Sequence, residues 1–504
     1  MSAPRLGKVW LVGAGPGDPG LLTQKGARAI ANCDALVYDY LAAEPIVALA
    51  PPDCERIYVG KKAGSHTMPQ AEIEALLVRL AREGKRVVRL KGGDVVVFAR
   101  GGEEATELAK AGIPFELVPG ISSALAAPAY AGIPITHRAW NTSFLVATGH
   151  EDPSKGESSL DFAKLANPHA TLVFLMAMGN LAGIVAQLLA HGMPTETPVA
   201  IVREGTKPTQ ETLTATLATV VAEVERTHLS APAIVVIGNV VRERERMRWF
   251  DRGPLFGKRV LVTRPRGQAG TFAERLWEAG AEPLLAPTIA LAPPDDEAAA
   301  QAAVRRVRDY RWLVFTSQNG VAAFFDRLSA DGADARALGG VRIAAIGPKT
   351  AERLLAHGIR ADFVPAQYVA EAVAEGLLAH SAPGDRLLLF RAQEARDVLP
   401  ETLRAQGRAV EVVAAYTTVV LRDPALAESA RRADIWTFTS ASTVRGLVTN
   451  VPDAAALARE RIVACIGPIT AAAARESGLP VDVVADEFTV EGLLVALDEV
   501  PTRR

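Results

Sequence analysis

The stretch Val9-Trp10-Leu11-Val12-Gly13-Ala14-Gly15-Pro16-Gly17-Asp18 is a short apolar run that ends in a glycine-rich turn. An apolar run of this length before a turn predicts a buried β-strand. Glycines directly after a strand let the backbone approach a ligand closely. The turn departs from a dinucleotide-binding fingerprint, because Asp18 replaces the third glycine and Pro16 and Pro19 interrupt the helix that should follow. The stretch therefore predicts an α/β protein and disfavours a nicotinamide dehydrogenase.

The alternation of short apolar runs with amphipathic stretches continues along the whole chain. Apolar runs occur at residues 87–90 and 435–438, for example, and helical patterns occur at 71–82 and 271–279. Short apolar runs predict buried strands, and strands that alternate with helices are typical of α/β layers. We therefore expect an α/β fold in both halves of the chain.

A run of alternating charges at residues 242–248 separates the two halves. A glycine-proline pair at 253–254 follows it, and a new apolar run begins soon afterwards. Because Gly-Pro favours a break between elements, the seam indicates a linker rather than a solvated helix face. We expect one domain over residues 1–250, a linker over 251–256 and a second domain over 257–504.

The second half repeats itself in three places that keep the same order. Repeated units in one order predict two similar α/β lobes, and the cleft between two lobes is a favoured ligand site. A duplicated fold without a shared site is the alternative. The paired segments are WLVFTS at 312–317 with IWTFTS at 435–440, IGPKTA at 346–351 with IGPITA at 466–471, and GKRVLV at 257–262 with GDRLLL at 384–389.

Composition places the chain among globular proteins. At 504 residues it has room for about three or four domains, and 49% apolar with 22% charged residues is an ordinary globular balance. The net charge of −2 disfavours a protein that coats nucleic acid. No apolar run reaches the ~18 residues that a membrane span needs. Three widely spaced cysteines disfavour a disulfide framework, so we expect a cytoplasmic protein with no nucleic-acid or membrane partner.

Further clusters in the first half carry residue types suited to ligands. Lys91-Gly92-Gly93-Asp94 follows an apolar run and ends in a carboxylate, which suits ligand hydroxyls or an ammonium group. The small residues at 118–124 leave room for a flat or elongated ligand. Arg100 and Arg138 suit the capture of carboxylates. Each piece alone also fits a turn or a surface salt bridge, and the eight histidines show no metal-ligand spacing, so we expect no metal site.

Taken together, these clusters form a series of motifs in one order. On these motifs, residues 8–250 resemble the uroporphyrinogen-III C-methyltransferases of the tetrapyrrole methylase family, and the resemblance covers the whole half. The matching motifs are VGAGPGDP at 12–19, YDYL at 38–41, GKKAG at 60–64, VRLKGGD at 88–94, RGGEE at 100–104, VPGI at 118–121, GIPITHR at 132–138, TGH at 148–150 and TPVA at 197–200.

The resemblance implies two α/β lobes with S-adenosyl-L-methionine bound in the cleft between them, and a homodimer formed through this half. It gives proton-handling roles to Asp39 and Lys61, and substrate roles to Arg100, Glu103 and Arg138. The cofactor contacts that it implies are Pro16, Gly92, Gly93, Asp94, Val97, Ser122, Ser123, Met176 and Gly205.

Several of these positions also fit other roles. Asp39 alone would fit a helix cap or a residue that orients a neighbour, and Met176 alone would fit core packing. The base that removes a proton after methyl transfer is left open among Asp39, Glu103 and Arg100. Two residues that flank the site depart from the family pattern, with Val95 in place of a proline and Ala99 in place of a glycine.

Hydroxyl-bearing residues follow strands in both repeats of the second half. Hydroxyls and free backbone N–H groups at strand ends and helix starts suit carboxylates, and they equally suit helix N-capping. The four candidates for substrate binding are Ser317, Thr350, Ser440 and Thr470.

The second half carries its own series of motifs, VLVTRP at 260–265, FTSQNGV at 315–321, AY at 415–416, FTSASTV at 438–444 and IGPITA at 466–471. In their order they resemble uroporphyrinogen-III synthase. The resemblance implies two α/β lobes, one of 257–288 with 417–504 and the other of 289–416. It implies closure of linear hydroxymethylbilane with inversion of the last pyrrole ring and without a cofactor. It makes Tyr416 the candidate that assists departure of the hydroxyl, although a core tyrosine is the alternative.

The two resemblances support each other, because the second half would make the substrate of the first. We expect a bifunctional enzyme that cyclises hydroxymethylbilane to uroporphyrinogen III and methylates that product twice to precorrin-2. The alternatives are a later precorrin methyltransferase and a regulatory or scaffold protein with one degenerate catalytic half. The segments Tyr38-Asp39 and Lys91-Gly92-Gly93-Asp94 argue against the first alternative, whereas Val95 and Ala99 keep the second one open.

Overall fold

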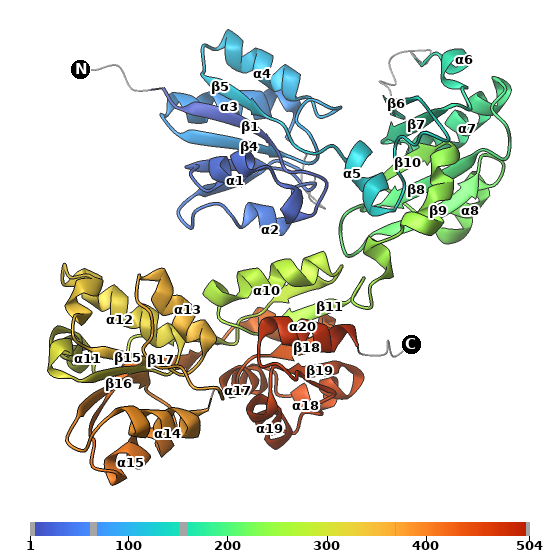
Figure 1. Cartoon of the computed structure of the whole chain (residues 1–504). Helices are drawn as coiled ribbons and strands as arrows, with labels where there is room; N and C mark the ends of the chain where they lie inside the picture. The colour runs from blue at the N-terminus through green and yellow to red at the C-terminus, as the bar shows by residue number, and fades with distance from the viewer. Residues whose placement is uncertain (1–5, 61–67, 151–159, 368, 500–504) are drawn as a thin grey trace, which may run out of the picture. The chain divides into compact units, whose positions relative to one another are not determined.

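The computed structural model describes residues 6–60, 68–150, 160–367 and 369–499. The chain forms two compact units (Figure 1). The first unit holds residues 1–260, 271–284 and 494–504, and the second holds residues 261–270 and 285–493. In the described ranges, no helix combines the length and the apolar character that crossing a membrane requires.

The first unit begins with an all-parallel sheet of five strands. They are β1 (Lys8–Gly13), β2 (Ala35–Tyr38), β3 (Glu55–Tyr58), β4 (Arg86–Lys91) and β5 (Phe115–Val118). The order in the sheet is β3-β2-β4-β1-β5. One face packs on α1 (Gln24–Ile30) and α2 (Glu44–Val47), and the other packs on α3 (Gln70–Arg82) and α4 (Gly101–Lys110), as Figure 1 shows. Because helices cover both faces, the strands read as nearly continuous apolar runs.

The second sheet of the first unit is mixed. Its strands are β6 (Ser143–Thr148), β7 (Ala170–Leu175), β8 (Pro198–Arg203), β9 (Glu211–Thr216) and β10 (Ala233–Ile237), in the order β6-β7-β10-β8-β9. β6 and β7 are parallel, whereas the other pairs are antiparallel. One face packs on α5 (Ser123–Tyr130), and the other packs on α6 (Phe162–Leu165), α7 (Leu181–Ala190) and α8 (Val220–Thr227).

Two further five-stranded sheets lie in the second half of the chain. The strands are β11 (Arg259–Val262), β12 (Glu282–Leu285), β13 (Ile289–Ala292), β14 (Trp312–Phe315), β15 (Arg342–Ala345), β16 (Arg386–Ala392), β17 (Ala409–Val420), β18 (Ile435–Phe438), β19 (Ile462–Cys465) and β20 (Val483–Val484). One sheet has the order β12-β11-β18-β19-β20 and the other has the order β13-β17-β16-β14-β15.

Helices also cover both faces of the sheet β13-β17-β16-β14-β15. Its core includes the fully buried Phe315, Phe324 and Phe390. One face packs on α11 (Glu297–Arg305), α12 (Gln318–Ala330) and α13 (Pro348–Ala356), and the other packs on α14 (Ala370–His380) and α15 (Val398–Ala405). The remaining helices of this half are α10 (Arg266–Glu278), α16 (Pro424–Arg432), α17 (Ala441–Asn450), α18 (Ala454–Leu457), α19 (Pro468–Glu476) and α20 (Val490–Asp498).

The order of the strands confirms the duplication that the sequence repeats predict. The series β16-β14-β15 in one sheet has the same order as β11-β18-β19 in the other. Two of the three pairs of repeated segments lie on β16, β14, β11 and β18. The third pair, which starts with IGP, directly follows β15 and β19 and leads into α13 and α19. The α/β class and the duplicated second half are therefore confirmed.

The charge run at residues 242–248 is packed in the first unit. Arg244, in α9 (Arg244–Met247), forms an ion pair of 2.6 Å with Asp251, and both side chains are less than one-tenth exposed. Burial alone would raise the pKa of Asp251, but hydrogen bonds from Arg244 and Arg248 outweigh burial and hold this pKa below its usual range. Phe250 is buried as well. The segment is thus part of a folded unit, and the domain boundaries at 250 and 257 stay a prediction.

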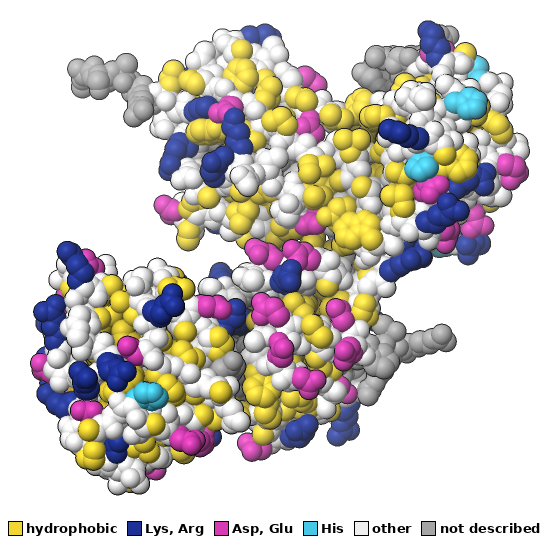
Figure 2. Space-filling model, in the orientation of Figure 1, with side chains coloured by type: hydrophobic (Ala, Val, Ile, Leu, Met, Phe, Trp, Pro, Cys, Tyr) yellow, Lys and Arg dark blue, Asp and Glu magenta, His cyan; other side chains and the backbone are white. Residues whose placement is uncertain are grey.

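Basic and acidic side chains lie interspersed on the face of both units that Figure 2 shows. This mixture accompanies the net charge of −2. Large apolar side chains are also exposed, and three of them, Val96, Phe98 and Met176, follow strands of the first unit. Those three matter for the site described next.

Candidate functional sites

Three glycine-rich loops meet at the carboxyl ends of β1, β4 and β5. These strands are parallel neighbours, so their carboxyl ends lie at one edge of the sheet, where open α/β sheets bind ligands. Gly15 and Gly93 exchange backbone hydrogen bonds of 3.1 and 2.7 Å. A Cβ atom at Gly13 would lie 2.5 Å from the backbone nitrogen of Gly120. The loops approach this closely because they lack side chains, and the structure brings together glycine clusters that are far apart in the sequence.

The carboxylate of Asp94 fastens the second glycine loop to the third. One of its oxygens accepts hydrogen bonds from the backbone N–H groups of Val96 at 2.8 Å and Val97 at 3.1 Å. The other oxygen accepts from the N–H of Gly120 at 3.0 Å. Asp94 is buried, so water competes little for these bonds. The carboxylate thus holds the loops in place, and the cofactor contact that the resemblance implies for it stays a prediction.

Asp39 lies beside these loops, directly after β2. Its turn touches the second loop, because a Cβ atom at Gly92 would lie 2.4 Å from the Cβ of Leu41. One Asp39 oxygen accepts from the Leu41 N–H at 3.1 Å, and the other pairs with the Arg89 guanidinium at 3.2 Å. The side chain keeps 22% of its surface exposed. The helix-cap interpretation is wrong, because the residue that precedes α2 is Ala43. Asp39 is therefore an oriented and accessible carboxylate.

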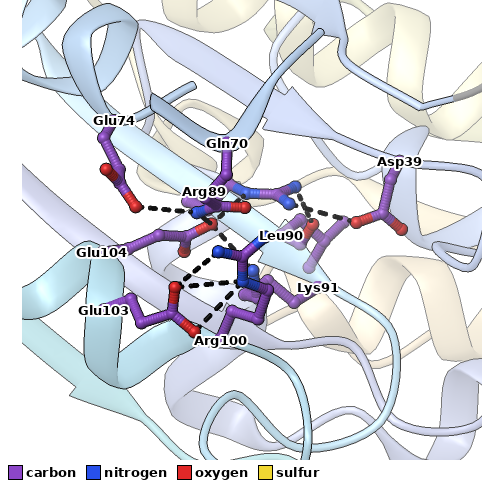
Figure 3. Close-up of polar contacts among 9 residues, drawn as sticks. All are labelled: Asp39, Gln70, Glu74, Arg89, Leu90, Lys91, Arg100, Glu103 and Glu104. Carbon is purple, nitrogen blue, oxygen red and sulfur yellow. Dashed lines mark hydrogen bonds and ion pairs between the residues drawn. The ribbon is translucent and has the colours of Figure 1, made fainter. Parts of the chain in front are cut away.

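Arg89 belongs to a buried cluster of charges, which Figure 3 shows. Glu104, in the first turn of α4, is fully buried, and its Oε1 accepts from Arg89 at 3.3 Å and from Lys91 at 2.8 Å. Gln70 of α3 donates to the same oxygen at 3.3 Å. Burial and then the charge of Arg89 lower the pKa of Lys91, and the carboxylate of Glu104 offsets them only in part.

The sequence analysis gives no role to Arg89 or Glu104 and names Lys91 only within a cluster, although the sequence carries a signal for each. Arg89 and Lys91 occupy alternate positions of a strand whose remaining residues after the exposed Arg86 are apolar, so both point to the same face of a buried sheet. Glu104 lies on the buried stripe of α4 that Gly101, Ala105 and Leu108 share with it. A charge at a position that periodicity assigns to the core indicates a paired group.

Arg100 and Glu103 lie on the exposed side of α4. Their ion pair measures 2.6 Å, and each side chain is 56% exposed. The hydrogen bond from Arg100 holds the pKa of Glu103 below its usual range. Arg138 is exposed as well, and Lys61 lies outside the described residues. The roles that the resemblance gives to these four residues stay predictions.

The start of α5 completes the glycine-loop site. The Ser122 hydroxyl accepts from the Ala124 N–H at 3.3 Å and caps this helix. The backbone nitrogen of Ser123 lies 3.7 Å from the place of a Cβ at Gly93. Gly205 packs against α5, because a Cβ there would lie 2.4 Å from the Cβ of Ala127. Cofactor contacts of these residues stay predictions.

Met176 and Pro16 also lie in turns after strands. Met176 follows β7 with φ 55° and is 51% exposed, so the core-packing alternative is wrong. Pro16 lies between two glycines with positive φ, Gly15 and Gly17. Neither residue has a tested ligand contact.

The loop after β1 is also tied to the side of the unit that carries the second sheet. The Asp18 N–H donates to the Thr206 hydroxyl at 3.1 Å, and the Asp18 carboxylate accepts from the Tyr130 O–H at 2.5 Å. Burial and the hydrogen bond to Asp18 raise the pKa of Tyr130 above its usual range. The ring of Tyr130 packs edge-on against Trp249 and Phe250, at centroid distances of 4.9 and 4.8 Å. The loop is therefore connected through Tyr130 to the segment between the two halves.

In the second half, Tyr416 lies on β17 beside a β-bulge, where the pairing with β16 shifts by one residue. Its hydroxyl and the Ser317 hydroxyl form a hydrogen bond of 3.1 Å. Ser317 also accepts from the Gly320 N–H at 3.0 Å, which confirms its N-capping role on α12. Tyr416 lines a pocket of about 470 Å³ between β13, β17, α11 and α12. The tyrosine is thus held by one hydrogen bond next to an open space.

The other hydroxyl candidates occupy matching helix starts. Ser440 caps α17 in a reciprocal capping box with Thr443, so its capping role is confirmed. Thr350 and Thr470 lie in the first turns of α13 and α19, and both are buried. Neither threonine is an N-cap, because each helix begins with a Gly-Pro pair whose glycine is the cap. The capping alternative is therefore wrong for the two threonines, and substrate binding by all four residues stays a prediction.

Comparisons with known proteins match both halves of the chain. Residues 8–221 match the family of tetrapyrrole (corrin/porphyrin) methylases, and residues 270–495 match uroporphyrinogen-III synthase HemD. The porphyrin biosynthesis protein HemD of Ruminiclostridium josui is 38% identical over 499 residues, and the match covers 98% of each chain.

Two uroporphyrinogen-III methyltransferases also match this chain. The uroporphyrinogen-III C-methyltransferase of Bacillus subtilis is 41% identical over 334 residues, which are 66% of this chain and 68% of that one. The S-adenosyl-L-methionine-dependent uroporphyrinogen III methyltransferase of Methanosarcina barkeri is 52% identical over 235 residues, which are 47% of this chain and 92% of that one. The chain spans about half the length of the siroheme synthases that it also matches.

The fold, the paired halves and these matches define a bifunctional enzyme of tetrapyrrole biosynthesis with a methyltransferase part and a synthase part. The chain belongs to the tetrapyrrole methylase family in its first half and to the uroporphyrinogen-III synthase family in its second half. Both resemblances that the sequence motifs indicate are confirmed.

Proposed function

We propose that the second half closes hydroxymethylbilane to uroporphyrinogen III with inversion of the last pyrrole ring. The first half then methylates this product twice with S-adenosylmethionine and gives precorrin-2. One observation carries the proposal for the first half, namely that Arg89 orients the accessible carboxylate of Asp39 in a turn whose Leu41 packs against the glycine loop at Gly92. This arrangement combines a proton acceptor with loops that leave room for a ligand.

The residues around the glycine loops fit S-adenosylmethionine. A Cβ atom at Gly93 would meet no atom closer than 3.7 Å, so there is open space beside this loop, and Phe98 and Met176 expose apolar surface suited to an adenosine ring. When bound, the cofactor supplies an electrophilic methyl group. The loop residues that the resemblance names, together with Ser122 and Ser123 at the start of α5, would hold it.

The residues of the chain itself take two tasks in methyl transfer. Asp39 accepts the proton that the pyrrole loses, and Arg89 keeps this carboxylate oriented. Arg100 and Arg138 are exposed cations that suit the carboxylates of uroporphyrinogen. Positioning of the pyrrole carbon against the methyl group supplies much of the rate.

In the second half, the Tyr416 hydroxyl donates a proton to the departing hydroxyl of hydroxymethylbilane, which leaves as water. The tyrosine regains a proton when the pyrrole carbon that closes the ring loses its own. Ser317 holds the tyrosine at 3.1 Å, and the pocket beside it leaves space for part of the substrate. The closure needs no cofactor in this proposal, because the substrate provides its own electrophile. We further propose that the enzyme is cytoplasmic and that it forms a homodimer through its methyltransferase half. Sedimentation of the purified protein would test the homodimer.

A coupled assay tests the proposed function. The full chain is given hydroxymethylbilane and S-adenosylmethionine with a labelled methyl group, and the products are separated by mass and by isomer type. We expect dimethylated precorrin-2 without any added synthase. Type I product alone would overturn the synthase assignment, and type III product without label would overturn the methyltransferase assignment.

Matched variants connect each activity to its residue. We expect Tyr416→Phe to slow ring closure. Tyr310→Phe is the control, because Tyr310 is a buried tyrosine whose hydroxyl donates to Glu411, and we expect this variant to leave ring closure unchanged. Asp39→Asn is expected to slow methylation. Asp34→Asn, at the opposite end of β2, removes an exposed salt bridge to Arg86 and serves as the control.

A further inference from the structure

The charged cluster behind Asp39 has an arrangement that packing does not require. The guanidinium of Arg89 uses each of its nitrogens, donating through Nε to Glu104 at 3.3 Å, through Nη1 to the Leu90 carbonyl at 3.0 Å and through Nη2 to Asp39 at 3.2 Å. Figure 3 shows Arg89 between the two carboxylates. Because the guanidinium is planar and rigid, the position of Glu104 sets the direction of the bond to Asp39.

Burial of these charges is expensive for the fold. Arg89 and Lys91 are only 4% and 6% exposed, and Glu104 is not exposed at all. Desolvation of buried ion pairs often costs more than their attraction returns, so apolar residues of similar volume would stabilise such a core at least as well. Among the described residues, Oε2 of Glu104 has no hydrogen-bond partner. An arrangement of this kind points to a functional role rather than to stability.

The cluster also balances charge around Asp39. Two cations, Arg89 and Lys91, face two carboxylates, Asp39 and Glu104. Further titratable groups in the described part of the chain surround the cluster, with Tyr40 and Tyr58 on the side of Asp39 and with Glu74, Arg100 and Glu103 on the side of Glu104. Removal of one member of the balanced set therefore changes the field at Asp39 in a direction that depends on its sign.

We propose that Glu104 and Lys91 are positioning residues for methyl transfer, acting through Arg89 on the orientation and charge of Asp39. Glu104 fixes the guanidinium of Arg89, which holds Asp39. Lys91 supplies the second positive charge, so that the charges of the two carboxylates, Asp39 and Glu104, are both neutralised. Neither residue touches the substrate or the cofactor. This inference rests on the proposed function of the first half and names two residues that determine how well its proton acceptor works.

A double-mutant cycle tests the path through Asp39. We expect Glu104→Gln to lower kcat for methylation by about 10- to 100-fold, the range seen when the partner behind a functional ligand is removed. S-adenosylhomocysteine should bind this variant within about threefold of the parent, because the glycine loops are unchanged. In the Asp39→Asn background the same substitution should have little further effect, since the group it positions is gone. Glu107→Gln, one turn further along α4 and exposed, is the matched control.

The pH profile supplies a readout that a purely structural role would not move. Loss of the negative charge in Glu104→Gln leaves two cations beside Asp39, which favours its ionised form and shifts the acidic limb of kcat/KM to lower pH. Loss of the positive charge in Lys91→Met shifts the same limb to higher pH. Opposite shifts from two buried substitutions support the inference, and they are measurable even where one variant loses activity through partial unfolding.

The outcomes separate this inference from the proposed function. If the parent and Glu107→Gln do not methylate uroporphyrinogen III, the proposed function falls. Suppose that both are active and that Glu104→Gln lowers kcat by the same factor in the Asp39→Asn background as in the parent. In that case Glu104 does not act through Asp39. Shifts of the acidic limb in the same direction for Glu104→Gln and Lys91→Met would likewise overturn the charge-balance argument. Should Glu104→Gln fail to fold, Lys91→Met decides alone, and an unmoved limb overturns the inference.

Discussion

Asp94→Asn perturbs the joint between two glycine loops without a change of shape. The carboxylate accepts three backbone hydrogen bonds, two through one oxygen and one through the other. An asparagine keeps one oxygen, so its best orientation retains the bonds from Val96 and Val97 and sets its NH₂ group against the Gly120 N–H. At least one bond to a charged acceptor is lost, which costs about 1.5–3 kcal/mol. That loss corresponds to a factor of about 10 to 150 in an equilibrium constant.

The cost must be visible either in binding or in stability. If the two glycine loops separate in the ligand-free Asp94→Asn variant, we expect this variant to bind S-adenosylhomocysteine about 10- to 150-fold more weakly, as measured by isothermal titration. If they stay together, the same loss lowers the free energy of unfolding of the first unit in urea. Asp53→Asn, an exposed aspartate of the same half, controls for loss of charge alone. Unchanged affinity together with unchanged unfolding would refute the argument that Asp94 holds the loops.

Two further predictions concern titratable groups outside the sites. The three cysteines are buried, and burial raises the pKa of Cys33 and of Cys465 to about 12. We therefore expect a thiol reagent to label none of them quickly at pH 7 until urea unfolds the chain. Rapid labelling of the native protein would contradict this prediction. Hydrogen bonds from Lys25 and Lys8 lower the pKa of Glu116 from 4.5 to about 2, so its stabilising contribution is present above pH 4.5 and is lost as the pH falls toward 2. Urea unfolding of Glu116→Gln should therefore show a smaller loss of stability between pH 6 and pH 3 than the parent shows, and equal losses would refute the assignment.

The sequence is sufficient to predict most of the architecture. Apolar runs followed by turns identify strands such as β1 and β18, because buried parallel strands have no polar face that would obscure the pattern. The repeated segments predict the duplicated sheet order, since they mark equivalent strands and helix starts in the same order in both lobes. The glycine motifs predict a site at strand ends, and the structure brings three of them to one edge.

The roles of single residues were harder to predict, because they depend on contacts between distant segments. Glu103 and Glu104 are neighbours in the sequence, yet one is exposed on α4 and the other is fully buried. Their difference depends on where α4 begins, which a left-handed Arg100 determines at φ 61°. The bond between Asp39 and Arg89 joins two strands and could not be predicted from spacing. The capping role of Ser317 was predictable, whereas its bond to Tyr416 required the fold.

The position of Tyr130 limits how the two activities can be divided between separate polypeptides. Its hydroxyl supports the first glycine loop through Asp18, and its ring rests on Trp249 and Phe250 at the end of the methylase half. If the chain were divided before Trp249 and Phe250, the methyltransferase fragment would lose the aromatic residues that support its first glycine loop through Tyr130. A viable methyltransferase cut from this chain must therefore carry the seam with it, at least through Asp251, which also neutralises the buried Arg244.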